Sequence, residues 1–237
     1  MNHNDRDVPL AWWLLFPPLM FIALFLTFLF SKEWYRIMLI HDQFDVGIIE
    51  NATWMVLLPG IVAGFVAFSY KRYFPDARLG WTTLICTLAC IYFAGEEISW
   101  GQHFFGWETG ETLTEINKQK ETNIHNISSW FNQKPRMIVE WWVIIGGLIL
   151  PFWRWIRKTR TEVSEFSYWF WPTNIVIPTA LVFFFLQCGY WYRKVMEEDI
   201  ERWMYDSEIR EYYVALFLSL YLISICIRLR TRAAFKA

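Results

Sequence analysis

The sequence predicts an all-α polytopic integral membrane protein, a bundle of six transmembrane helices in a single domain. Hydrophobic residues make up 55% of its 237 residues, and sixteen residues are tryptophan. Soluble domains of this length rarely carry 20% aromatic residues, whereas multipass proteins place tryptophan and tyrosine at both membrane interfaces. Six segments are apolar enough to cross a hydrocarbon core, for which about 20 helical residues suffice. The predicted spans are residues 10–30, 46–70, 79–95, 137–156, 174–192 and 212–227.

Each span has its own signature in the sequence. The first follows a polar leader without a basic cluster, and no small-residue cleavage site follows it, so we expect a retained helix rather than a signal peptide. The second begins with Glu50 and Asn51 before a long apolar run, and the third is short and should continue into Glu96 and Glu97. The fourth carries Glu140 near its start, and aromatic residues border the fifth and sixth.

The distribution of charge predicts the orientation. Six spans put both termini and the 71–78 and 157–173 loops on one side, which holds twelve Lys/Arg against five acids, while the other side holds ten against eighteen. The basic residues of the first side form short, dense groups, and such loops stay in the cytoplasm. We therefore expect a multi-pass protein of the cell (inner) membrane with both termini cytoplasmic. The 96–136 region should be a long outer loop that contains an interfacial helix.

Carboxylates from three predicted helices fall at one depth, near the outer interface. Glu50 lies at the outer end of the second span, Glu96 and Glu97 close the third, and Glu140 interrupts the fourth. A glutamate at a helix end can simply reach the interface, but ionisable residues within a membrane are often functional. Carboxylates this close would repel one another, so a proton, a metal ion or a cationic side chain should neutralise them.

The residues after Glu96 suggest specific chemical roles. If this segment is helical, Glu96, Ser99 and His103 share one face, and Glu97 lies about 100° around the helix. Glu96 or Glu97 would be a general base, and His103 or His125 an acid or a metal ligand. Helical phase favours Glu96 as the chemical residue, with Glu97 in an orienting or neutralising role. A divalent metal is a candidate cofactor with Glu96, His103 and His125 as candidate ligands, although their spacing matches no strict metal signature.

Further residues are candidates for supporting roles and for neutralising the carboxylates. The 193–211 segment has mixed charge at helical spacing, so we expect a solvated or interfacial helix that continues the fifth span outward. In that position Arg193 would offer a counter-charge, and Arg136 is a second candidate besides the histidines. The residues with predicted supporting roles are Glu50, Asn51, Ser99, Glu140 and Arg193.

One stretch of the sequence carries a resemblance to known proteins. The order EEISWGQ, FGWET and ETNIHN within residues 94–127 resembles a group of uncharacterised bacterial multipass membrane proteins. The resemblance implies the same membrane class and no particular chemistry.

Two enzyme groups share shorter features with the same stretch. Intramembrane proteases of the CAAX-processing type have paired glutamates, which Glu96 and Glu97 resemble, but Gly101 stands where their following arginine would be. Alkaline ceramidases have a Ser-x-x-x-His motif, which Ser99 and His103 match, but the downstream His-x-x-x-His is missing. Both resemblances are too short to carry a function over to this chain.

Three functions remain open from the sequence. The first is a hydrolase or transferase of lipid or lipid-linked substrates at the outer leaflet, with membrane lipids as its partners. The second is a non-catalytic subunit or assembly factor that packs against other membrane proteins or a second copy of itself. The third is a proton- or cation-coupled transporter, which the lack of a visible repeat disfavours. We expect no nucleic-acid partner.

Overall fold

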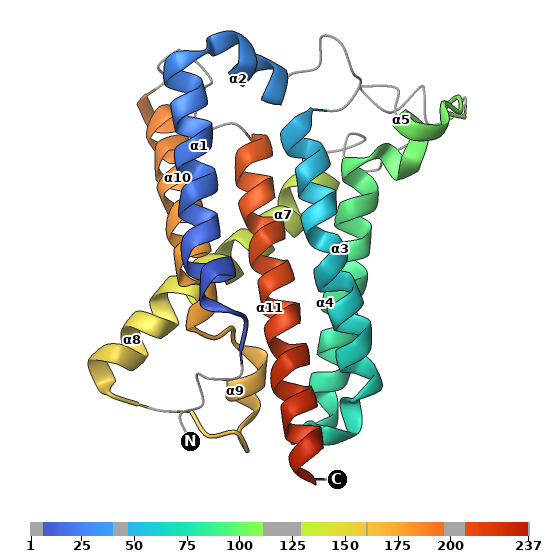
Figure 1. The fold of residues 1–237 in the computed structure, drawn as a ribbon, viewed down its shortest axis with the longest axis vertical. Coiled ribbons are helices and arrows are strands. Elements are labelled where there is room, and N and C mark those ends of the chain that lie inside the picture. Colours follow the sequence, from blue (N-terminus) through green and yellow to red (C-terminus); the bar gives the residue numbers. More distant parts are fainter. Residues whose placement is uncertain (1–6, 40–46, 111–128, 160, 197–206, 237) are drawn as a thin grey trace.

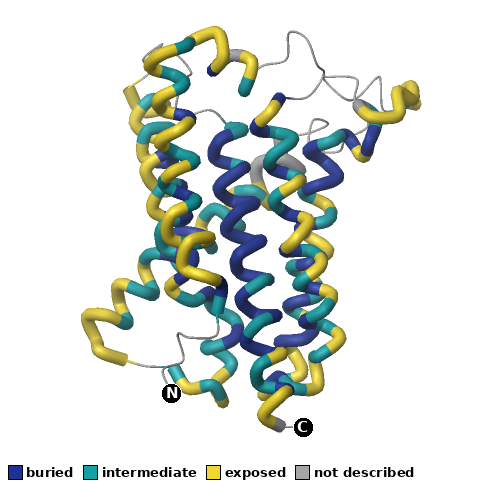
Figure 2. Tube along the Cα trace, viewed as in Figure 1, coloured by how far each residue is buried: buried dark blue, intermediate teal, exposed yellow. Residues whose placement is uncertain are grey.

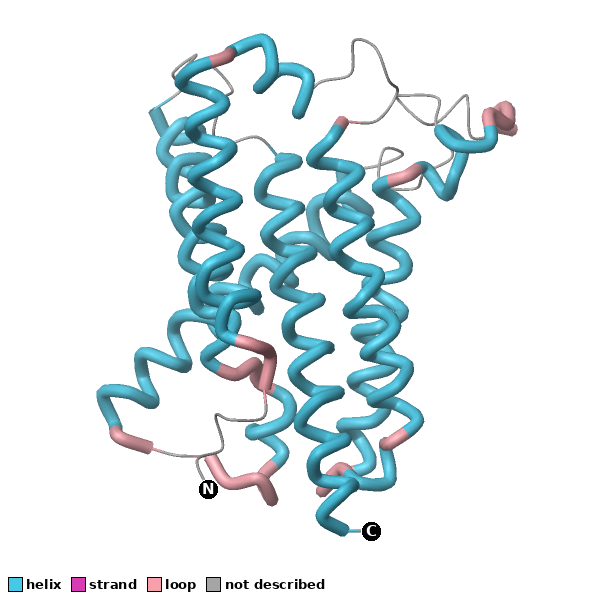
Figure 3. The backbone as a smooth tube through the Cα atoms, viewed as in Figure 1, coloured by secondary structure: helices cyan, strands magenta, loops and turns pink. Residues whose placement is uncertain are grey.

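The computed structural model describes residues 7–39, 47–110, 129–159, 161–196 and 207–236, and nearly all of them are helical (Figure 1, Figure 3). Six helices are long and apolar enough to cross a membrane, and no strand occurs among these residues. The prediction of an all-α bundle of six transmembrane helices is therefore confirmed. The candidate spans are Ala11–Phe30, Ile48–Ser69, Ala77–Glu97, Lys134–Arg157, Phe166–Met196 and Ser207–Phe235.

The main helices of the bundle follow the chain order of the spans. A π-helical turn η2 (Ala11–Leu15) leads into the first, and a second one, η5 (Ile145–Ile149), joins the two parts of the fourth. The helices are α1 (Phe16–Phe30), α2 (Lys32–Leu39), α3 (Ile48–Ser69), α4 (Ala77–Glu97), α5 (Gln102–Phe105), α7 (Ser129–Ile144), α8 (Leu150–Arg157), α9 (Phe166–Phe170), α10 (Ile177–Met196) and α11 (Ser207–Lys236).

Helix α11 forms the centre of the bundle (Figure 2). In the most apolar stretch of this helix 83% of the residues are buried inside the protein, whereas in the corresponding stretch of the first span only 11% are buried. Tyr213, Phe217 and Leu222 are fully buried at different positions around the helix, as expected for a helix that is apolar on all sides and surrounded by others. The remaining helices present large apolar side chains outward, where a bilayer would cover them.

Small residues allow α3 to approach its two neighbours closely. A Cβ atom at Gly60 would lie 2.6 Å from the Cα atom of Ser219 on α11, and one at Gly64 would clash with Oγ1 of Thr87 on α4. Both contacts are far closer than van der Waals contact, so no larger side chain fits there without a shift of the helices. Such contacts replace the hydrophobic effect as a source of association between helices in lipid.

Hydrogen bonds bring both described chain ends to the same end of the bundle. The Oδ2 atom of Asp7 accepts hydrogen bonds from Thr173 at 2.9 Å and from Ser224, in the second half of α11, at 3.0 Å. Arg228 and Arg232 donate to backbone carbonyls of the segment 163–168. Figure 1 shows the same placement, with N and C marked at one end.

Basic residues gather at this end, which we call the basic end. Helix α4 begins there with Asp76, whose side chain accepts a hydrogen bond from the backbone N–H of Arg78 at 2.8 Å and caps the helix. The Arg78 guanidinium also hydrogen-bonds this carboxylate and holds the pKa of Asp76 below its usual range. Lys71, Arg228 and Arg232 lie at the same end, where they stack on aromatic rings.

Two boundaries differ from the sequence prediction. Helix α11 begins at Ser207, so the prediction that residues 207–211 belong to a solvated outer helix is wrong. Arg210 is buried in the bundle, because the polar residues of this turn pair with other helices instead of facing water. The loop predicted for residues 96–136 is also shorter at both ends, since α4 includes Glu97 and α7 begins at Ser129.

Candidate functional site

Three carboxylates meet at the end of the bundle opposite the basic end. Glu97 is the last residue of α4, and Glu208 and Glu211 lie at the start of α11. Because Glu208 and Glu211 are three residues apart on a helix, they project from the same face. One carboxylate oxygen from each of the three residues lies within 4.8 Å of the other two. We call Glu97, Glu208 and Glu211 the acidic cluster.

Arg136 joins the acidic cluster to α7. Its Nε atom donates to Oε1 of Glu140 at 2.9 Å, one helical turn away on α7. Its Nη1 atom pairs with the carboxylate of Glu211 on α11. Arg136 therefore connects two carboxylates from different helices, and its own side chain is only 23% exposed.

Arg210 is a second arginine close to Glu140. Its Nη1 atom donates to Oε1 of Gln187 on α10 at 2.8 Å and lies 3.5 Å from Oε1 of Glu140. The guanidinium also lies 4.1 Å from the ring centroid of Tyr190, a cation–π contact. Helices α7, α10 and α11 are thereby connected through one buried arginine.

Negative charge exceeds positive charge in this network. Among the described residues, four carboxylates (Glu97, Glu140, Glu208 and Glu211) share two guanidinium groups. The charge of Glu50 also acts on Glu97. Glu97 is 8% exposed, and its Oε2 atom is buried without a hydrogen-bond partner in the described part of the chain. A buried carboxylate oxygen in this condition is unfavourable unless a proton, a cation or a substrate group binds to it.

The chain reverses direction directly after Glu97. Ser99, Trp100 and Gly101 have φ angles of 45°, 56° and 98°, a left-handed conformation that only glycine adopts freely. The Trp100 indole folds back and donates from Nε1 to Oε1 of Glu96 at 2.7 Å. It lies against Gly95, where a Cβ atom would be 2.8 Å from the ring. We call residues 95–101 the hook.

The hook separates residues that the sequence analysis groups together. The expected shared face of Glu96, Ser99 and His103 does not form, because the helix ends before Ser99 and the backbone turns the other way. Glu96 is tied to Trp100, whereas Glu97 joins the acidic cluster. The backbone of His103 lies in α5, beyond the hook. His125 and the expected interfacial helix of residues 112–120 fall outside the described residues.

The predicted supporting residues have different surroundings. Glu50 accepts from the backbone N–H of Gly47 at 3.4 Å and caps α3, at a place where its charge reaches Glu97. Asn51 donates to the Gly47 carbonyl at 3.1 Å and accepts from the Trp54 indole at 3.0 Å, so its side chain organises the start of α3. Arg193 is half-buried on α10 and forms no ion pair with a carboxylate among the described residues.

Sequence reasoning missed four members of the network, namely Gln187, Glu208, Arg210 and Glu211. The last three precede the apolar run at Tyr212, and the sequence analysis assigns them to a solvated loop helix. A signal was available in the sequence, because the pair Glu208 and Glu211 stands immediately before a long apolar run. Glu96 and Glu97 likewise border an apolar run, at its far end. Gln187 has no such signal, since it is a single polar residue in an apolar helix.

Comparisons of the chain with protein-family models, with curated proteins and with solved structures found no match. The chemistry of the site must therefore be inferred from its own residues. Buried carboxylates near arginines can abstract a proton, hold a cation, or position an anionic group.

Proposed function

We propose that the protein is a membrane-embedded enzyme that hydrolyses, or transfers a group of, lipid or lipid-linked substrates at the outer leaflet. The observation that carries this proposal is the acidic cluster at one end of the bundle, which joins the buried Glu97 to the half-buried Glu208 and Glu211 and has an excess of negative charge. Functional sites often contain such clusters of buried ionisable groups. A substrate that diffuses in the bilayer would reach this end without leaving the membrane.

Two side chains of the network have roles in this proposal. Glu97 is the general base, because its Oε2 atom is buried and no described residue hydrogen-bonds it. Arg136 keeps a buried Nη2 atom without a hydrogen-bond partner among the described residues. A guanidinium beside the carboxylates suits an anionic substrate group such as phosphate. Glu96 keeps the hook in place through Trp100 and takes no part in the chemistry.

The core below the acidic cluster favours chemistry at one end over transport across the membrane. Along α11 the next buried residues include Tyr213 and Phe217. On α3 and α4 the buried threonines Thr53, Thr83 and Thr87 donate their hydroxyl hydrogens to carbonyls of their own helices, so they offer no free hydroxyl to guide an ion. The exception among the described buried threonines is Thr179 of α10, whose Oγ1 atom has no hydrogen-bond partner in the described part of the chain.

The proposed orientation follows from the two ends of the bundle. Arg78, Arg228, Arg232 and Lys71 lie at the basic end, and basic residues close to membrane spans stay in the cytoplasm. We therefore assign both termini to the cytoplasm and the acidic cluster to the outer leaflet of the cell membrane.

A lipid conversion assay tests the proposed enzyme. The purified protein is reconstituted into nanodiscs made from a lipid extract of its host membrane, and lipids are compared by mass spectrometry before and after incubation. We expect one lipid species to fall and a product to rise with the wild type. The Glu97→Gln variant should convert about 10²–10⁴-fold more slowly, which is the usual effect of losing a general base.

The matched control is the adjacent glutamate. Glu96→Gln keeps an oxygen that can accept from the Trp100 indole, so this variant should retain activity near the wild-type level. Identical lipid profiles for the wild type and for folded Glu97→Gln protein would contradict an enzyme. A stable partner protein retained with both would then favour the non-catalytic subunit.

A further inference from the structure

The acidic cluster has the geometry of a cation site. Glu97 comes from α4, and Glu208 and Glu211 come from one face of α11, so two helices supply three carboxylates to a single point. Their closest oxygens lie within 4.8 Å of one another. An ion with metal–oxygen distances of about 2.0–2.6 Å fits between oxygens at this separation.

Nearby cations do not neutralise the whole cluster. Arg136 pairs with Glu211 and Glu140, and Arg210 is held by Gln187 and Glu140. Neither guanidinium forms an ion pair with Glu97 among the described residues. The carboxylate of Glu97 therefore remains without an ion-pair partner in this part of the chain.

The Oε2 atom of Glu97 is a second, independent sign of a ligand. Its residue is more than nine-tenths buried, and the atom has no hydrogen-bond partner in the described part of the chain. Proteins rarely bury a carboxylate oxygen in this way unless something binds to it. Since the cluster holds this carboxylate next to those of Glu208 and Glu211, a shared cation would satisfy all three.

We propose that Glu97, Glu208 and Glu211 bind one divalent cation of the Mg²⁺ or Mn²⁺ class. All three ligands are carboxylate oxygens, which these hard ions prefer, whereas zinc favours sites with nitrogen or sulfur ligands. Three protein ligands leave coordination positions for water and substrate in an octahedral ion. The proposed ligands differ from the set expected from the sequence, which was Glu96, His103 and His125. The new site uses Glu97, the neighbour of Glu96, and two carboxylates of α11. That the ion serves catalysis rests on the proposed function, and Glu97 would then act as a ligand of the ion and not as a free general base. That the ion binds does not rest on the proposed function.

Binding is measured with Mn²⁺ as the probe, by electron paramagnetic resonance of the purified full-length protein in detergent. We expect one Mn²⁺ per chain for the wild type, displaced by excess Mg²⁺, and at least tenfold weaker binding for Glu97→Gln and for Glu208→Gln. Glu96→Gln, one residue away and outside the cluster, should bind like the wild type. Mn²⁺ should also raise the Tm of the wild type and of Glu96→Gln, but not of the two cluster variants.

The outcomes separate this inference from the proposed enzyme. Wild-type protein that binds no Mn²⁺, or cluster variants that are folded and bind it normally, would overturn the cation site and favour a proton shared by the carboxylates. Mn²⁺ binding that depends on the cluster, together with an unchanged lipid profile, would support the cation site and reject the enzyme. Lipid conversion that survives complete chelation would support the enzyme and reject the ion as its cofactor.

Discussion

Arg210 shows how a single buried charged residue can connect three helices at one end of the bundle. It lies on the most buried helix, yet its guanidinium finds Gln187, Glu140 and the face of Tyr190 within reach. Removing one partner of such a buried network leaves the other charge without compensation, which is more harmful than removing both. Because these partners belong to α7 and α10, the arginine also sets how these helices meet α11.

Arg210→Met should destabilise the protein strongly. The variant leaves Glu140 with Arg136 as its only described cationic partner and leaves Gln187 without its donor, so we expect a loss of about 3–5 kcal/mol of unfolding free energy. Thermal unfolding in detergent, followed by circular dichroism, measures the effect. Arg230→Met on the exposed side of the same helix is the control and should change stability by about 0.5 kcal/mol or less.

A second substitution tests the reason for that loss. Adding Glu140→Gln to Arg210→Met removes the carboxylate that has lost one of its two arginine partners, so the double variant should lose less stability than the sum of the two single variants. A loss equal to that sum would show that Glu140 does not depend on Arg210.

The hook is the element that positions the acidic cluster. It ends α4 immediately after Glu97 through three successive left-handed residues, Ser99, Trp100 and Gly101. Such backbone strain persists only where surrounding contacts maintain it, and it is concentrated at functional sites. The hydrogen bond from Trp100 to Glu96 and the close packing of the Trp100 ring on Gly95 supply these contacts. The EEISWGQ motif is therefore a structural device that directs Glu96 and Glu97 to different environments.

Gly101→Ala should loosen the hook. At a φ angle of 98° an alanine is strained, and its Cβ would lie 3.2 Å from the rings of Phe105 and Trp107, so we expect a cost of about 1–2 kcal/mol. Hydrogen exchange measured by mass spectrometry should rise in peptides that cover residues 95–107. Gly110→Ala, where a Cβ meets nothing within 4 Å, should leave the exchange of this segment unchanged.

The contact between α3 and α11 depends on a glycine in the same way. Gly60→Val would place new atoms against the backbone at Ser219, and overpacking of this kind costs about 1–3 kcal/mol. A lower Tm in detergent is the expected result. Leu58→Val, on the exposed face of the same helix, should be nearly neutral, and an equal drop for both variants would show that α3 does not approach α11 at this point.

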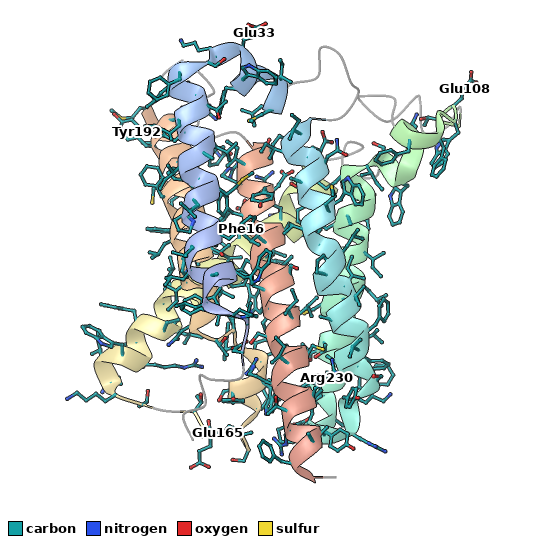
Figure 4. All side chains as sticks on the ribbon, viewed as in Figure 1. Phe16, Glu33, Glu108, Glu165, Tyr192 and Arg230 are labelled. Atoms are coloured by element: carbon teal, nitrogen blue, oxygen red, sulfur yellow. The ribbon has the colours of Figure 1, made fainter. Side chains whose placement is uncertain are left out.

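At the scale of the whole molecule, the two ends of the bundle differ in chemistry. The basic end carries arginines stacked on Trp169 and Tyr168, and the opposite end carries the acidic cluster. Figure 4 shows two acidic residues that mark the ends, Glu108 beside the cluster end and Glu165 beside the basic end. The side of the membrane on which each of these two residues lies therefore shows whether the acidic cluster faces outward.

Cysteine labelling tests this orientation in a background without the four native cysteines. A membrane-impermeant maleimide added to intact cells should modify Glu108→Cys and should modify Glu165→Cys only after permeabilisation. The reason is that dense basic residues favour the cytoplasmic side of a membrane, and the proposed orientation places the end near Glu165 there. The reverse labelling pattern would invert the proposed topology and move the acidic cluster to the inner leaflet.

The sequence by itself determined the fold class and the approximate spans. Apolar length and interfacial aromatics are local properties of the chain, and the bilayer imposes helices on every segment that crosses it. The sequence also pointed to Glu97, Glu140 and Arg136 as candidates, because a charge beside an apolar run is visible without a structure. Between the two adjacent glutamates, helical phase favoured Glu96, but that phase was extrapolated past the end of α4 at Glu97, and it is Glu97 that joins the acidic cluster.

Only the tertiary structure decided which residues meet. Glu208, Arg210, Glu211 and Gln187 lie far along the chain from Glu97 and Glu140, and their pairing depends on α11 passing through the centre of the bundle. That central position is set by close contacts such as Gly60 against Ser219, which involve pairs of distant residues. The left-handed turn at Ser99 likewise depends on Trp100 packing on Gly95. The position of each of these side chains depends on non-local contacts, whereas hydropathy and helical periodicity describe only near neighbours in the chain.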